Sequence, residues 1–188
     1  DEATVRALWP HVRRAVEHMD ALRMSERTAA NLASDRRAYF GLMPPSISHE
    51  GYSDKPAYSY WDDFWTAIGY RSALELAQAL GLADDATRVA AQRDEFLADL
   101  IASLAASTKL HGLDVLPGAA DRGDVDPTSS TIALSPGGLL GTLPEELVRN
   151  TFARYWRDFS ERRDGSKAWD AYTPYEWRTV GSFLRLGW

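Results

Sequence analysis

The chain has 188 residues, enough for one ordinary domain with a substantial core and too few for two large ones. A net charge of -6 and a pI near 5.2 argue against a nucleic-acid partner, because no basic stripe is available to displace counterions from phosphate. No apolar run approaches the roughly 18 residues that a membrane-spanning helix needs, so no membrane segment is expected.

The first predicted helix covers residues 4 to about 27, where apolar residues recur at spacings of three and four. Pro10 interrupts this pattern and indicates either a kink or the true first turn. Residues 39–59 form a long irregular stretch with Pro44-Pro45 and Pro56 as breakers. A loop of this length in a compact domain is usually functional or disordered, and its Tyr and His content favours function.

Two helices joined by a short turn follow. One runs from residue 60 to about 80, with Gly81 as its expected C′ residue. The next begins after Asp84-Asp85, which are good N-cap residues, and carries an apolar stripe as far as Leu104. A second irregular stretch covers residues 111–126, and a short helix is predicted at 127–134.

Two more helices complete the chain. One starts at residues 142–145, where Thr142 and Glu145 match a capping box with proline in the first turn, and ends before Gly165. The last starts near residues 173–176, which repeat that pattern. No segment shows sustained strand alternation, and long and short connections alternate. We therefore predict one all-α segment, residues 1–188, built of helical hairpins with one elaborated face.

Aromatic and acidic residues gather where the second helix begins, from His49-Glu50-Gly51-Tyr52 to Tyr60-Trp61-Asp62-Asp63-Phe64-Trp65. Sugars stack their apolar faces on Trp and Tyr, and their hydroxyls take charge-assisted hydrogen bonds from carboxylates. Hydrolysis of a glycosidic bond needs a protonated carboxylic acid at the leaving oxygen and a second carboxylate as nucleophile or base. The stretch therefore indicates sugar binding together with acid chemistry.

A purely structural interpretation fits part of the same stretch. Ser59 can cap the helix, with Asp62 in its first turn facing the helix dipole, while Tyr60 and Phe64 form a core stripe. The dipole lowers the pKa of an aspartate, whereas a general acid needs a raised pKa. Burial among aromatic rings and repulsion from a neighbouring carboxylate would have to outweigh the dipole, so both interpretations stay open.

The segment Tyr60-Trp61-Asp62-Asp63-Phe64-Trp65, preceded by Gly41-Leu42-Met43-Pro44 and Glu50-Gly51-Tyr52, resembles the inner-helix openings of six-hairpin (α/α)6-barrel glycosidases, the superfamily of glucoamylases and trehalases. There a Trp-Glu-Glu or a Trp-Asp carries the general acid. The resemblance implies that Asp62 is the acid, with Trp61 and Asp63 as sugar contacts. It also implies that this chain supplies about half of the helices of a toroid. The relatives it points to are bacterial, some of them joined to discoidin-like sugar-binding modules.

Two later stretches fall where such a fold would place its remaining substrate-facing loops. Residues 121–128 contain Asp126, for which a turn and helix cap is the favoured interpretation. Residues 169–178 set four aromatic side chains around two acids and an arginine, and Glu176 has a second interpretation as a capping-box partner. The residues expected to contact the sugar are Tyr52, Tyr60, Trp61, Asp63, Trp65, Asp126, Tyr172, Tyr175, Trp177 and Arg178.

No cofactor or metal is expected. The four histidines lack metal-ligand spacing, and the acids of residues 121–128 lack the glycine and closing glutamate of a calcium loop. Cysteine is absent, and no Gly-rich phosphate loop or Gly-x-Ser-x-Gly elbow is present.

The leading hypothesis is a glycosidase that works by acid-assisted, inverting hydrolysis. Asp62 is the proposed acid, and Glu50 or Glu176 is the candidate second carboxylate within the chain. We expect a segment of a longer polypeptide, and the resemblance places the catalytic base beyond Trp188. The alternatives are a non-catalytic carbohydrate-binding helical module and a helical domain whose aromatic residues bury a protein partner.

Overall fold

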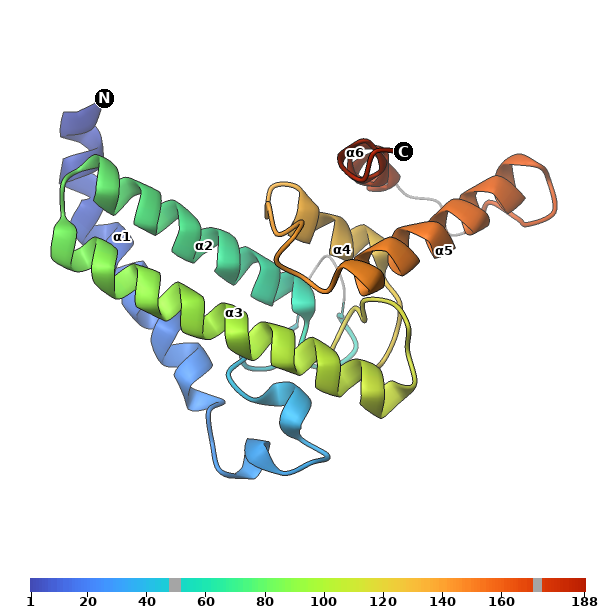
Figure 1. Ribbon diagram of the computed structural model, residues 1–188, viewed down its shortest axis with the longest axis horizontal. Coiled ribbons are helices and arrows are strands. Elements are labelled where there is room, and N and C mark those ends of the chain that lie inside the picture. Colours follow the sequence, from blue (N-terminus) through green and yellow to red (C-terminus); the bar gives the residue numbers. More distant parts are fainter. Residues whose placement is uncertain (48–51, 171–173) are drawn as a thin grey trace.

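The computed structural model describes residues 1–47, 52–170 and 174–188 (Figure 1). Over these residues the chain forms α-helices and short 3-10 turns, with no strand. The elements are α1 (Glu2–Ser25), η1 (Ala30–Leu32), η2 (Arg37–Tyr39), α2 (Tyr60–Ala79), α3 (Ala83–His111), α4 (Pro127–Leu134), α5 (Glu145–Arg163) and α6 (Glu176–Arg185). The predicted all-α class is confirmed.

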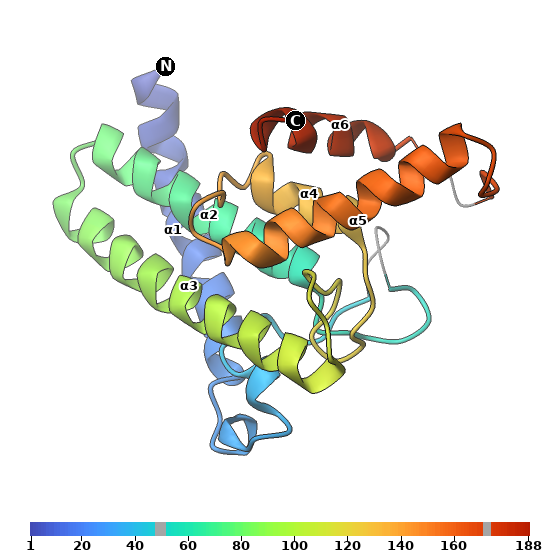
Figure 2. The ribbon, with the colours of Figure 1, turned by 45° about the vertical axis from the view of Figure 1, so that its right-hand side comes forward.

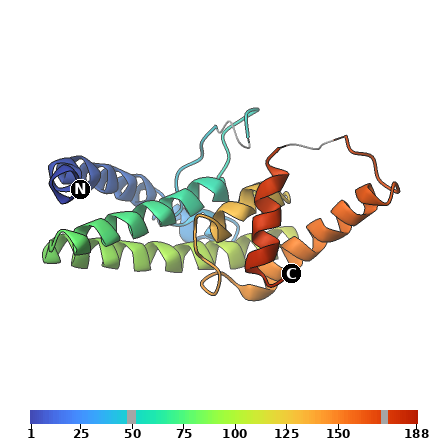
Figure 3. The same cartoon turned by 90° about the horizontal axis from the view of Figure 1, so that it is seen from above.

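Helices α2, α4 and α6 form a row through the molecule. α2 packs against α4 and α4 packs against α6, while α1 and α3 both pack against α2 (Figures 1 and 3). Arg71 of α2 donates hydrogen bonds to the carbonyl oxygens of Pro136 and Gly137, just after α4, and Arg185 near the end of α6 donates to Ser135. α2 and α4 therefore run in the same direction, whereas α6 crosses them and is seen end-on in Figure 1. The far end of α5 projects away from this row (Figure 2).

A buried cation ties α1, α2 and α3 together. Arg23 of α1 is 1% exposed, and its guanidinium donates to Tyr70 of α2 at 3.0 Å and to Glu95 of α3 at 2.7 Å. Asp20 accepts from the same guanidinium at 2.8 Å. A charge this deeply buried is tolerated only with such partners. Around it lies an apolar core that α2 and α3 share with their neighbours and that includes Phe64, Leu74, Phe96, Leu100 and Leu104.

Most predicted helix bounds agree with the structure, and the exceptions lie at helix starts. Pro10 lies inside α1 rather than at its beginning. α3 begins at Ala83, which places Asp84 and Asp85 in its first turn instead of at the cap. The capping box predicted for α5 is wrong, because the N-cap is Pro144 without a side-chain hydrogen bond. The cap predicted for the last helix rests on Thr173, which lies outside the described residues.

The two long connections predicted from the sequence lie together at the start of α2. Ser46 and Ala57 form an antiparallel bridge, as do Ser59 and Ala119. Tyr58 strengthens the pairing, because its backbone oxygen accepts from Ala120 at 2.8 Å. Loop residues 52–59 and 113–126 are therefore held next to each other, at the end of the helix row where α2 begins. None of the helices in the described parts of the chain has both the length and the apolar character needed to cross a lipid bilayer.

Candidate functional site

The amino-terminal ends of α2, α4 and α6 meet at one end of the helix row. The backbone N–H of Tyr60, the first residue of α2, donates to the carbonyl of Gly118 at 3.0 Å. A Cβ atom added at Gly118 would lie 3.1 Å from Cβ of Asp126, the cap of α4. Arg178 in the first turn of α6 lies over the ring of Trp61, 5.2 Å from its centroid. Side chains from three helices thus share one region.

Aromatic side chains form a partly exposed platform in this region. Trp61 and Trp65 lie on one side of α2 and meet edge to face, with ring centroids 6.0 Å apart. The Arg178 guanidinium contacts Trp61 and also lies 4.3 Å from the Tyr175 ring. Trp65 is 42% exposed and Tyr175 is 43% exposed. Four of the residues predicted to contact a sugar, namely Trp61, Trp65, Tyr175 and Arg178, are therefore neighbours.

Asp62 stands beside this platform and is partly exposed. Its carboxylate accepts a hydrogen bond from the hydroxyl of Ser46, which belongs to the loop of residues 42–47. Burial raises the pKa of Asp62 above its ordinary value, although the Ser46 hydrogen bond works in the opposite direction. Burial therefore has a larger effect on the pKa of Asp62 than the Ser46 hydrogen bond has.

Asp63 points into the protein, unlike its neighbour. Its side chain is fully buried, and Oδ1 accepts from the backbone N–H of Met43 at 2.9 Å. Its Oδ2 has no hydrogen-bond partner among the described residues. Burial raises the pKa of Asp63 well above the ordinary range, the Met43 amide opposes this, and the charge of Asp62 adds to it. Asp63 therefore cannot touch a ligand in this structure.

Tyr60 also belongs to the core rather than to the surface. Its ring is 1% exposed, and its hydroxyl pairs with that of Ser103 at 2.8 Å. Burial raises the pKa of the Tyr60 phenol. The core-stripe interpretation holds for Tyr60 and Phe64, and direct contact of Tyr60 with a sugar does not fit this position. Ser59 occupies the N-cap position but makes no side-chain cap.

Tyr52 belongs to a second polar group, where the paired loops meet. Its hydroxyl donates to Asp124 at 2.5 Å, and the Arg122 guanidinium lies 4.4 Å from its ring. Arg122 in turn forms an ion pair with Asp54 at 2.8 Å. Burial and the Asp124 hydrogen bond both raise the pKa of Tyr52. These contacts hold the two loops together.

Asp126 caps α4. Its carboxylate accepts from the backbone N–H groups of Thr128 and Ser129, each at 3.1 Å, and from the Ser129 hydroxyl. The turn-and-cap interpretation of this residue is therefore confirmed. Its carboxylate is only partly buried.

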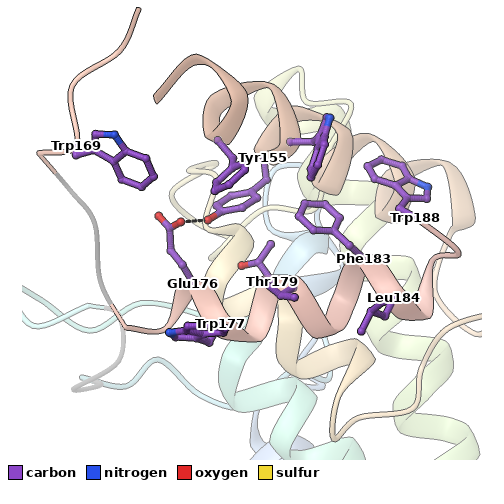
Figure 4. Close-up of a pocket in the computed structure, with 11 residues that line it drawn as sticks. Tyr155, Trp169, Glu176, Trp177, Thr179, Phe183, Leu184 and Trp188 are labelled. Atoms are coloured by element: carbon purple, nitrogen blue, oxygen red, sulfur yellow. Dashed lines mark hydrogen bonds between the residues drawn. The ribbon is translucent and has the colours of Figure 1, made fainter. Parts of the chain in front are cut away.

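Glu176 lies on the side of α6 that faces α5. Its carboxylate accepts from the Tyr155 hydroxyl and from Arg162 at 3.0 Å (Figure 4). Glu176 and Arg178 are two positions apart, so they leave the helix on nearly opposite sides. Since Arg178 contacts Trp61, the structure does not bring Glu176 beside Asp62.

The same side of α6 and the facing side of α5 enclose an apolar cleft with a volume of about 350 Å³ (Figure 4). Trp177 and Leu184 line the cleft and are 74% and 72% exposed. Arg162 lies 5.3 Å from the ring of Trp169, which also borders the cleft. Trp177 was predicted to contact sugar, and the structure places it here instead of on the Trp61 platform.

Two predicted site residues, Glu50 and Tyr172, lie outside the described residues. Ser46 and the amide of Met43, the partners of Asp62 and Asp63, were not predicted from the sequence. The Pro44-Pro45 pair between them is the one sequence signal that indicates a stiff segment there. Within the parts of the chain that the structure describes, no cluster of three acidic or histidine side chains is arranged to hold a metal ion.

Comparison with known proteins returned no match of this chain to a family model, to a curated protein or to a solved structure.

Proposed function

We propose that this chain carries a carbohydrate site of the glycosidase type where α2, α4 and α6 begin, with Asp62 as the general acid. One observation carries the proposal: the partly exposed carboxylate of Asp62, whose pKa is raised by burial, lies three residues from Trp65 on α2, and such spacing puts it on the same side of the helix as the platform of Trp61 and Trp65. A sugar ring stacked on a tryptophan would bring its glycosidic oxygen close to such a carboxyl group.

The chemistry asked of Asp62 is proton donation to the leaving oxygen. A raised pKa keeps more of the carboxyl protonated near neutral pH, which is the state a general acid needs. The Ser46 hydroxyl stabilises the carboxylate that remains after proton transfer and holds its orientation. The proposal assigns no second carboxylate, because Glu176 faces α5 and Glu50 lies outside the described residues.

The helix arrangement supports the toroid part of the proposal. α2 and α4 lie side by side and run the same way, α6 packs across α4, and α1 and α3 both pack against α2. The parallel pair α2 and α4, with α3 between them in the chain, is what two consecutive hairpins of an (α/α)6 toroid would produce. The long connections lie at the end where the row begins, which would be the substrate-facing end.

The first test is sugar binding by the 188-residue chain. A panel of oligosaccharides is screened by isothermal titration calorimetry with wild type and with Trp61→Ala. We expect binding by the wild type and a loss of about fivefold or more in affinity in the variant, since aromatic stacking contributes on the order of 1 kcal/mol or more. The absence of binding to every sugar by the wild-type chain would refute the proposal.

The second test is hydrolysis, measured on the protein at its full natural length. Reducing-sugar release is compared between wild type, Asp62→Asn and Asp84→Asn. Asp84 is an exposed aspartate in the first turn of α3, so its variant controls for loss of one surface charge. Loss of a general acid removes about 100-fold or more of the rate, whereas the control should keep full activity. Full activity in Asp62→Asn would remove this residue from the mechanism.

A protein partner bound through α5 and α6 is the second candidate function. The observation that favours it is the pair of highly exposed apolar side chains, Trp177 and Leu184, at the rim of one cleft. Trp177→Ala separates the two proposals. Sugar binding at the platform should survive this change, and loss of a binding partner without loss of sugar binding would favour the interaction domain.

A further inference from the structure

Two adjacent carboxylates hold the loop of residues 41–47 against the start of α2. Asp63 accepts the backbone N–H of Met43 from inside, and Asp62 accepts the hydroxyl of Ser46 from outside. Neighbouring residues of a helix point about 100° apart, so the two contacts lie on different faces of α2. The loop therefore passes from the interior to the candidate site within three residues.

The segment between the two contacts is stiff. Pro44 and Pro45 separate Met43 from Ser46, and each proline ring restricts its own backbone angle φ to near -65°. Proline also disfavours the helical conformation of the residue before it, which restricts Met43 and Pro44 further. The position of the Met43 amide consequently determines where Ser46 can lie.

The Ser46 end of this segment is fixed as well. Ser46 exchanges two backbone hydrogen bonds with Ala57, both at 3.0 Å, and Ala57 is fully buried. Leu42, next to Met43, is also fully buried. The Ser46 hydroxyl thus has a defined place beside Asp62, provided that the Met43 end of the segment stays where Asp63 holds it.

The geometry points to Asp63 as a positioning residue: through the Met43 amide and the Pro44-Pro45 segment it holds the Ser46 hydroxyl against Asp62. This inference rests on the proposed function, in which Asp62 is the acid. It replaces the expectation that Asp63 touches sugar, because a fully buried carboxyl can act on a ligand only through other groups. The raised pKa of Asp63 is consistent with a neutral carboxyl whose oxygen still accepts from an amide.

The test follows the ionisation of Asp62 directly and needs no sugar. The carbon-13 carboxyl signal of Asp62, assigned by its loss in Asp62→Asn, is titrated by NMR in wild type, Ser46→Ala, Asp63→Ala and Asp63→Asn. Both changes at position 63 remove the same ionisable carboxyl group, and only asparagine keeps an oxygen that can accept from the Met43 amide. The difference between these two variants therefore separates the positioning effect from the loss of the ionisable group.

The Ser46 hydrogen bond lowers the pKa of Asp62, so Ser46→Ala should raise that pKa. We expect Asp63→Ala to raise the pKa of Asp62 by the same amount as Ser46→Ala, and Asp63→Asn to raise it less. The Ser46→Ala/Asp63→Ala double variant should raise this pKa no further than either single variant. If folded Asp63→Ala titrates like Asp63→Asn, the inference is overturned. Absence of sugar binding in the wild type would defeat the proposed function alone, because this titration would still decide the role of Asp63.

Hydrogen exchange provides a second measurement, for use if Asp63→Ala yields too little folded protein for NMR. In wild type and in Asp63→Asn the Met43 amide should be protected from exchange, although it lies outside any helix. A Met43 amide that exchanges in the wild type as fast as one in an unstructured peptide would overturn the inference without any variant.

Discussion

Replacing Gly41 by alanine should destabilise the protein far more than the same change at Gly81. Gly41 has a φ of 75° and Gly81 a φ of 68°, so both lie in the left-handed region that a Cβ atom disfavours. Their surroundings differ. A Cβ at Gly81 meets no atom within 4 Å, whereas a Cβ at Gly41 would lie 2.6 Å from Cγ of Asp99. The Asp99 carboxylate is buried and lies 3.0 Å from Nε of Arg27.

The two costs can be separated by magnitude. The left-handed conformation alone costs a non-glycine residue roughly 1–2 kcal/mol, which is the whole effect expected for Gly81→Ala. At Gly41 the carboxylate of Asp99 must also move away from Arg27, and disrupting a buried ion pair costs about 3–5 kcal/mol. Gly41→Ala should therefore lose about 4–7 kcal/mol, a large share of the 5–15 kcal/mol that stabilises a typical domain.

Urea unfolding followed by circular dichroism measures both variants against wild type. The comparison uses the free energy of unfolding, with the m-value checked for each variant. Equal losses in Gly41→Ala and Gly81→Ala would refute the reasoning, because they would mean that Asp99 does not occupy the space next to Gly41.

Two other predictions concern carboxylates near the candidate site. Burial raises the native pKa of Asp63 above its unfolded value, so its contribution to stability is fully present below the unfolded pKa and is lost as pH rises through the native pKa. In Asp63→Asn this loss disappears, so the urea midpoint of the variant relative to wild type should rise with pH; a difference that stays constant with pH contradicts this. Asp126→Ala removes the acceptor of two backbone N–H groups at the start of α4 and should cost about 1–2 kcal/mol in the same unfolding assay. A change within error would mean that water replaces this cap.

Helix positions could be predicted because their signals are local. The apolar spacing that sets α1 and α2, the glycine that ends α2 and the Asp-Pro that opens α4 all act within a few residues. The prediction that Thr142 caps α5 was wrong, because the helix begins two residues later than the local sequence pattern indicates. Thr142 lies in a turn whose N–H bonds to the carbonyl of Leu139, and α5 begins only after Pro144.

The sequence by itself determined the all-α class and the places where aromatic and acidic residues concentrate. Only the tertiary structure decided the role of each of these residues, since adjacent residues such as Asp62 and Asp63 point to different sides of one helix. The loop of residues 41–47, which is distant in sequence, buries Asp63 against the amide of Met43. The same loop provides the Ser46 hydroxyl to Asp62, which remains partly exposed. Likewise, Arg178 contacts Trp61 of α2 and Glu176 contacts Arg162 of α5. These partners depend on which helices pack against the two sides of α6, which the spacing along the chain does not determine. Periodicity is a property of one helix, whereas a site is a property of the contacts between several.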